Sequence, residues 1–259
     1  MNSKLAKPFL LLIGFILIVG LACSAAVPDE APAAEPAAPA EEPTAVPPTD
    51  VPEPTATAIP EPTTPPPTPT PQRFFTEEFG DDFAGWPYIY FADDDSGFDV
   101  YPENDRLVFD IQDENNYVYA YYEDQVYDDV HLETEVNNRG ANTNNVSLIC
   151  RLDLDEGWYE FNITSGGYYN FYAYDIAGDT GYNELVTGGV KNLKTGKETN
   201  LYAVTCDGKT LTLYVNGKEI KSFEENKYVF KEGMVGVSVS SFDILPVNVE
   251  FEWFKIMEP

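Results

Sequence analysis

Residues 24–72 contain no aromatic side chain, no lysine and no arginine, yet they hold sixteen of the chain's 21 prolines. Without large apolar side chains, such a stretch cannot bury enough surface to offset the conformational entropy that folding removes. We therefore expect it to be disordered. The density of proline favours an extended, semi-rigid chain that rises about 3.1 Å per residue. This segment is typical of a stalk that holds a folded domain away from an attachment point.

The N-terminus lacks an apolar run long enough to cross a bilayer. Its apolar segment covers residues 9–22, follows two lysines and ends at Cys23. A transmembrane helix needs about 20 apolar residues, whereas a shorter run suits the apolar region of a secretory signal. Residues 20–23, Gly-Leu-Ala-Cys, resemble the lipobox of bacterial lipoproteins. This resemblance implies that Cys23 is lipidated and becomes the mature N-terminus. An ordinary cleaved signal with an unrelated cysteine is the alternative.

The composition changes abruptly at Arg73. The residues from there on hold all 17 tyrosines, all three tryptophans and 14 of the 16 phenylalanines, but only four prolines. They can therefore build a full hydrophobic core as one domain. The sequence predicts a signal peptide (residues 1–22), a lipidated cysteine with a disordered stalk (23–72) and a folded domain (73–259). A lipid anchor and a stalk would place this domain at a bacterial cell surface, with the anchor as its only membrane contact.

The folded domain has few basic residues. It carries 13 lysines and arginines against 36 aspartates and glutamates, which gives a net charge of −23. Nucleic acid is excluded as a partner, because a polyanion requires a basic surface. Acidity of this degree favours solubility and is compatible with neutral partners such as sugars.

The domain also lacks any stretch with a convincing helical period, and its apolar residues instead recur at every second position. This period is typical of strands with one buried and one solvated face. The dipeptides Asp207-Gly208 and Asn216-Gly217 lie between alternating runs and favour tight hairpins. We therefore predict an all-β, two-sheet antiparallel sandwich. The expected core positions are Val130, Leu132, Thr134, Val136, Val146, Leu148, Cys150, Leu152, Tyr159, Phe161, Ile163, Leu211, Leu213, Val215, Val235, Val237 and Val239.

A succession of short segments runs through the domain in a characteristic order. It includes an acidic, aromatic opening that ends at Trp86, and the pieces Leu-Tyr-Val-Asn-Gly (213–217) and Gly-Met-Val-Gly-Val (233–237). This succession resembles the concanavalin A-like, laminin-G-like jelly rolls, including members carried by bacterial lipoproteins, over residues 75–257. The resemblance implies a jelly-roll sandwich that binds carbohydrate or another extracellular polymer. A structural or protein-adhesive module remains an alternative.

Only three cysteines occur in the chain. If Cys23 carries lipid, Cys150 and Cys206 remain as a pair in an oxidising compartment, where disulfides form. Both cysteines fall on the apolar side of their predicted strands. We predict a disulfide between them. Two buried free thiols are the alternative.

The domain lacks the catalytic motif of the β-glucanases in this superfamily, Glu-x-Asp-x-x-Glu. Retaining hydrolysis needs two carboxyl groups about 5–5.5 Å apart. The nearest candidates are Glu133 with Glu135, which we expect on a solvated strand face, and residues 153–156, which we expect in a turn. His131, the single histidine, has no nucleophile in a triad arrangement and is expected at the surface. We therefore predict a domain that binds rather than reacts, with a glycosidase-like hydrolase as the alternative.

No cofactor is predicted, because the sequence has no Walker loop, dinucleotide fingerprint or zinc spacing. The acidic clusters at 93–95 and 153–157 lack the order of an EF-hand loop. A structural calcium ion, as found in some jelly rolls, would draw on Glu78, Asp81 or Glu252.

The best candidate for a binding site is one face of the central strands. If Cys150 points inward, strict alternation places Arg151 on the opposite face, together with outward residues of the next strands. Aromatic rings can stack on sugar rings while planar polar groups bind hydroxyls. An ordinary exposed sheet rich in tyrosine is the alternative. The predicted ligand-binding residues are Arg151, Trp158, Glu160, Asn162, Tyr172 and Tyr174.

Overall fold

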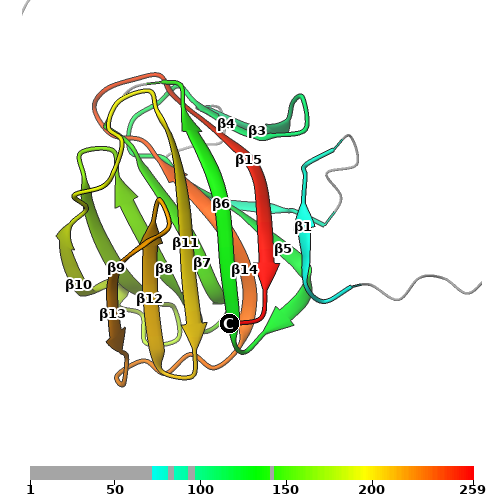
Figure 1. Ribbon diagram of the computed structural model, residues 1–259, viewed down its shortest axis with the longest axis vertical. Coiled ribbons are helices and arrows are strands. Elements are labelled where there is room, and N and C mark those ends of the chain that lie inside the picture. Colours follow the sequence, from blue (N-terminus) through cyan, green and yellow to red (C-terminus); the bar gives the residue numbers. More distant parts are fainter. Residues whose placement is uncertain (1–71, 81–84, 93–96, 141–142) are drawn as a thin grey trace, which may run out of the picture. The chain divides into compact units, whose positions relative to one another are not determined.

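The computed structural model describes residues 72–80, 85–92, 97–140 and 143–259. The predicted signal peptide, Cys23, the stalk up to residue 71, Asp81 and the acidic cluster at 93–95 lie outside these residues. Every regular element in the described part is a β-strand, and the strands form two antiparallel sheets (Figure 1). The predicted all-β sandwich is therefore confirmed. Within these same ranges, no helix has the length and apolar character of a membrane span.

One sheet has eight strands, of which seven follow the order β13-β12-β11-β6-β15-β4-β3, while β1 pairs with β15 beside this path. The C-terminal strand β15 thus lies in the middle of the sheet, where it pairs with both β6 and β4. The strands are β1 (Phe75–Glu77), β3 (Phe98–Pro102), β4 (Leu107–Ile111), β6 (Val130–Asn138), β11 (Thr199–Asp207), β12 (Thr210–Val215), β13 (Lys218–Glu224) and β15 (Val247–Met257).

The other sheet has seven strands in the order β10-β9-β8-β7-β14-β5-β2. Its central strands β7 and β8 form a hairpin, and β14 inserts between β7 and β5. The strands are β2 (Tyr88–Phe91), β5 (Tyr117–Tyr127), β7 (Asn145–Asp153), β8 (Gly157–Thr164), β9 (Tyr168–Asp175), β10 (Gly181–Gly189) and β14 (Gly233–Ser240).

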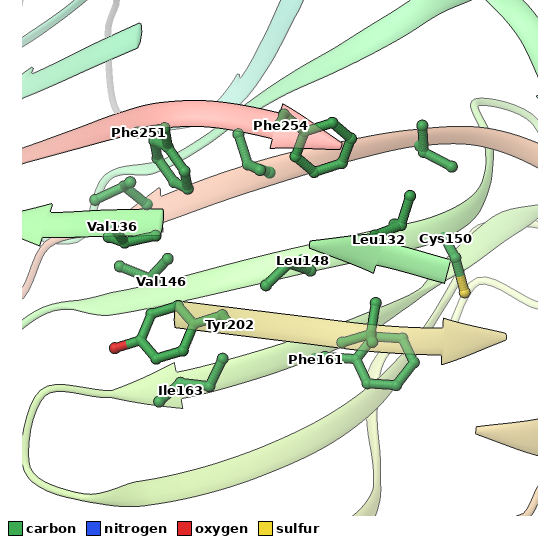
Figure 2. Close-up of a cluster of buried hydrophobic side chains, with 14 of the residues drawn as sticks. Leu132, Val136, Val146, Leu148, Cys150, Phe161, Ile163, Tyr202, Phe251 and Phe254 are labelled. Carbon is green, nitrogen blue, oxygen red and sulfur yellow. The ribbon is translucent and has the colours of Figure 1, made fainter. Parts of the chain in front are cut away.

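The hydrophobic core lies between the two sheets. Figure 2 shows Leu132, Phe251 and Phe254 of the eight-stranded sheet close to Leu148 and Phe161 of the other sheet. All five side chains are fully buried. Burying a large apolar side chain contributes about 1.5–3 kcal/mol, so this layer is the main source of stability.

The predicted alternation accounts for most of this core. Every predicted core position except Leu152 is buried between the sheets or, for Thr134, buried in strand β6. Leu152 instead packs in a second cluster with Tyr121 and Trp158, on the other side of the seven-stranded sheet. The prediction for Leu152 is wrong because β7 contains a bulge between Cys150 and Asp153, and one extra residue moves those that follow to the opposite face.

The two predicted hairpins are present. Asn216 and Gly217 form the turn between β12 and β13, with φ angles of 50° and 72°. Both residues are left-handed, as a type I′ turn requires. The other hairpin joins β11 to β12, but its turn lies one residue later than predicted, because Asp207 ends the strand and Gly208 (φ 52°) begins the turn.

The predicted disulfide is confirmed. Cys150 of β7 and Cys206 of β11 are bonded, with their Cα atoms 6.8 Å apart. Because β7 and β11 belong to different sheets, the bond joins the two layers of the sandwich through the core.

The seven-stranded sheet curves strongly around its face away from the core, which we call the concave face. Strands β5 and β10 are five steps apart in the sheet, so a flat sheet would separate them by about 24 Å, at roughly 4.8 Å a step. Nevertheless, the hydroxyl of Tyr119 on β5 is hydrogen-bonded to the hydroxyl of Tyr182 on β10. The edge strand β10 and strand β5, which is next to the opposite edge, therefore approach each other above the concave face.

Candidate binding site on the concave face

Five of the six predicted ligand residues lie on the concave face. Trp158, Glu160 and Asn162 alternate along β8 with core residues, and Tyr172 and Tyr174 do so along β9. In the register of the two strands, Glu160 is opposite Tyr172 and Trp158 is opposite Tyr174. The face assignment made from alternation is therefore confirmed for these five, while ligand binding by them stays a prediction.

Arg151 is the exception. It is 4% exposed and has a φ of 55°, because it lies in the bulge of β7. Its guanidinium donates hydrogen bonds to the backbone oxygens of Asp128 and Phe230 and to the carboxylate of Asp129, at 2.8–3.2 Å. Its side chain also lines a cavity at the edge of the core that includes Tyr159 and Leu211. The placement of Arg151 on the binding face is wrong, since the alternation is interrupted immediately before it.

Trp158 is on the predicted face but has no exposed surface. Its ring stacks on Tyr174, with 4.3 Å between centroids, and Phe91 lies 6.4 Å away in a nearly parallel plane. Tyr119 packs against its edge at 5.5 Å. Trp158 therefore supports the concave face and does not present a surface to a ligand.

A pocket of about 240 Å³ opens on the same face. Among the described residues, its walls are aromatic and its remaining lining groups are one carboxylate and two amides, with no lysine or arginine. It is lined by Tyr117, Asn145, Glu160, Asn162, Tyr172, Tyr182 and Phe242.

Glu160 is buried beside this pocket, with 2% of its surface exposed. Its carboxylate accepts hydrogen bonds from the hydroxyls of Ser147 (2.8 Å) and Tyr119 (3.2 Å) and, at 3.5 Å, from Nε1 of Trp158. Burial raises the pKa of Glu160, because the charged form loses hydration, although the hydrogen bonds from Ser147 and Trp158 act in the opposite direction. These bonds fix the position of the carboxyl group.

Several polar atoms near Glu160 are buried and have no partner. Nδ2 of Asn162 donates to Ser147 at 3.2 Å, but Oδ1 of Asn162 accepts no hydrogen bond. The hydroxyls of Ser238 and Ser240 on β14 are also unpartnered, and in register they lie opposite Ser147 and Asn145. Buried polar atoms are normally hydrogen-bonded. Oδ1 of Asn162 therefore offers an acceptor to a ligand hydroxyl or to water, whereas Ser238 and Ser240 are not among the described residues that line the pocket.

Tyr172 and Tyr182 of the site remain neutral hydroxyls. Burial raises the pKa of Tyr172, and the charges of Glu184 and Glu160 raise it further. Burial also raises the pKa of Tyr182. A neutral phenol can both donate and accept a hydrogen bond, and its ring provides a flat apolar surface.

The carboxylates that the sequence suggested as catalytic candidates are not among the described residues that line the pocket. Of the lining residues whose positions are described, Glu160 alone carries a carboxyl group. Glu133 and Glu135 lie on β6 of the other sheet. The carboxylate of Asp153 accepts hydrogen bonds from the backbone amides of Asp155 and Glu156, at 2.8 and 2.9 Å, as expected for a turn.

His131 and the predicted calcium ligands lie away from the pocket. His131 is half-buried and its Nδ1 is 2.7 Å from the hydroxyl of Thr205. Glu252 pairs with Arg106 at 2.8 Å, and Glu78 is exposed. Among the residues whose positions are described, no group of three histidine, cysteine, aspartate or glutamate side chains is placed to hold a metal ion.

Sequence reasoning missed four residues of the pocket lining. Tyr117 could have been found, because tyrosines alternate at 117, 119 and 121 in one strand. Asn145 is the first residue of β7 and Tyr182 the second residue of β10, and the side chains at strand ends are hard to place by alternation. Phe242 is in the loop after β14, where no periodicity indicates the direction of a side chain.

Comparison with known proteins finds solved structures only: no protein-family model matches the chain, and no curated protein does. A family 16 glycoside hydrolase of the mixed-linkage glucan PUL of Bacteroides ovatus, in complex with a product, matches with a TM-score of 0.54 and 13% identity, over 71% of this chain and 99% of that one. The β-glucanase of Bacillus licheniformis matches with a TM-score of 0.54 and 12% identity, over 73% of this chain and 100% of the enzyme.

A third match has no assigned function. It is a Bacillus subtilis protein with a galectin-like fold, with a TM-score of 0.56 and 8% identity, over 71% of this chain and 94% of that protein. At identities this low, a likeness shows the fold alone. The described part of the chain has the concanavalin A-like jelly-roll fold that its sequence resembles.

Proposed function

We propose that this protein is a bacterial cell-surface lipoprotein whose jelly-roll domain binds carbohydrate without cleaving it. The observation that carries the proposal is the pocket of the concave face, where tyrosine rings surround a floor of fixed polar groups. Sugar-binding sites combine the same two elements, since rings contact the apolar faces of pyranoses while polar groups bind hydroxyls. Glu160, Asn162 and Tyr172 are the proposed ligand contacts.

The polar groups of the floor suit a neutral ligand with many hydroxyls. The carboxylate of Glu160 and Oδ1 of Asn162 can accept hydrogen bonds from a ligand, and the hydroxyls of Tyr172 and Tyr182 can donate or accept them. Among the described residues that line the pocket, no basic side chain would attract a phosphate or a carboxylate. The net charge of −23 for residues 73–259 further disfavours anionic polymers.

The solved structures of similar fold support carbohydrate as the ligand class. The Bacteroides ovatus and Bacillus licheniformis proteins are glucan hydrolases by name. Within the described pocket, the feature that favours hydrolysis is Glu160, because a buried carboxyl group with a raised pKa can act as a proton donor. Binding without cleavage is the better proposal, since hydrolysis by the usual mechanism needs a second carboxylate in the same site.

A screen of the purified protein against immobilised neutral glycans tests this proposal. We expect binding to at least one neutral oligosaccharide, and we expect that glycan to be recovered uncut after prolonged incubation with the protein, as judged by mass spectrometry. Release of shorter products would establish the hydrolase alternative. Failure to bind any glycan, by a protein with a cooperative thermal transition, would contradict the proposed function.

The anchor is proposed from the N-terminal sequence and has its own test. Cys23→Ala should move the protein from the membrane fraction to the soluble fraction of the producing cells, because a lipidated Cys23 would be its only attachment. Substitution of the neighbouring Ser24 by alanine is the matched control and should leave the protein with the membranes. If Cys23→Ala fractionates with the membranes as the unchanged protein does, the lipoprotein proposal is wrong.

A further inference from the structure

The concave face is not an open cleft, because aromatic side chains from its two ends meet above it. Tyr119 of β5 and Tyr182 of β10 are joined through their hydroxyls, and the ring of Tyr117 lies 6.2 Å from that of Tyr182. These contacts cross the four strands that separate β5 from β10 in the sheet. We call Tyr117, Tyr119 and Tyr182 the tyrosine bridge.

On one side of the tyrosine bridge the concave face is filled. Phe91, from the edge strand β2, stacks on Tyr174 with 5.3 Å between centroids and lies above Trp158. The ring of Tyr182 packs against Tyr174 at 4.7 Å. Trp158 consequently has no exposed surface. A polymer chain therefore cannot reach the floor of the face at Trp158.

The pocket lies against the tyrosine bridge, since Tyr117 and Tyr182 are among its walls. Its floor is formed by Glu160 and Asn162, and the floor groups are held by Ser147. A sugar seated over this floor is enclosed on the side where Trp158 is buried. A glycan unit seated in the pocket is therefore blocked on that side, whereas an open cleft would let the chain continue in both directions.

We propose that the pocket recognises the terminal unit of a glycan chain and not an internal segment, with Tyr182 as the residue that closes the binding face. The inference rests on the proposed function, and it adds that the number of chain ends, rather than chain length, sets how much protein a glycan binds. A surface protein with this property would distinguish short fragments and chain ends from the bulk of an intact polysaccharide.

A size series tests the inference. Linear neutral glucans with β-1,3, β-1,4 or α-1,4 linkages are titrated calorimetrically, with short and long members of each series, and the number of protein molecules bound per glycan chain is measured at saturation. We expect one protein molecule per chain for both lengths of the linkage that binds, with similar affinity per chain. A stoichiometry that rises with chain length would overturn terminal recognition and leave the carbohydrate-binding proposal standing.

A variant gives the second arm of the same experiment. Tyr182→Ala removes the bridge at the edge strand, and it should let a long glucan take more than one protein molecule per chain. Tyr214→Ala, on the outer surface of the other sheet, is the matched control and should keep a stoichiometry of one. If Tyr182→Ala still binds one molecule per long chain, Tyr182 does not close the face and the inference is wrong. If neither a glucan nor any other glycan of the screen binds the unchanged protein, the proposed function itself is wrong.

Discussion

Replacing Cys150 and Cys206 together by alanine is expected to lower the free energy of unfolding by about 4 kcal/mol. The bond closes a loop between residues 56 positions apart, so its loss restores conformational freedom to the unfolded chain. It also joins the two sheets across the core, where both cysteines are fully buried. For a domain of this size, the melting temperature should fall by about 10 °C.

The measurement is denaturant unfolding of the double variant beside the unchanged protein, each with and without reductant. After complete reduction in the unfolded state, the unchanged protein should unfold at the same denaturant concentration as the variant, while the variant should not respond to reductant. A difference in unfolding free energy of less than about 1 kcal/mol, well below the chain-entropy value, would show that the bond contributes little.

Trp158→Ala is expected to destabilise the domain by about 3–5 kcal/mol, the usual cost of truncating a fully buried large aromatic side chain. Trp158 packs between Tyr174, Phe91 and Tyr119, so its removal leaves a cavity beneath three rings. It would also remove a donor to the buried carboxylate of Glu160.

The matched control is Tyr168→Ala, because Tyr168 belongs to the neighbouring strand and is 62% exposed. Its substitution should change the unfolding free energy by less than about 0.5 kcal/mol. Equal, small effects for the two variants in chemical denaturation would mean that Trp158 is a surface residue, free to contact a ligand, and that the packing of the concave face is different.

The alternation of apolar residues predicted most of the core because each strand has one face in the layer between the sheets. It failed at Arg151, where the chain inserts one extra residue into β7. A bulge has no reliable signature in a single sequence, since it depends on how neighbouring strands pair. The same insertion turned Leu152 toward Trp158 instead of the core.

The face of Trp158 could be predicted from the sequence, but its burial could not. The alternation of apolar and polar residues predicts which side of a sheet a residue occupies, whereas the exposure of its side chain depends on what covers that side. Here part of the cover comes from Phe91, which is distant in sequence and reaches Trp158 only because the sheet is curved. Tyr182 adds to it from β10, where it lies opposite Tyr174 in the pairing with β9. For the same reason, the candidate site could be predicted as a row of residues on two strands but not as a closed pocket.

The most direct test of the account is a calorimetric titration of the tightest neutral oligosaccharide from the glycan screen into the unchanged protein, Tyr172→Ala and Tyr214→Ala. Tyr172 lines the pocket opposite Glu160, whereas Tyr214 is on the other sheet. Loss of a stacking aromatic ring removes about 0.5–1.5 kcal/mol of binding free energy, so Tyr172→Ala should bind up to roughly tenfold more weakly, while Tyr214→Ala binds normally. Normal binding by a stably folded Tyr172→Ala would contradict the account and place the ligand outside the pocket of the concave face.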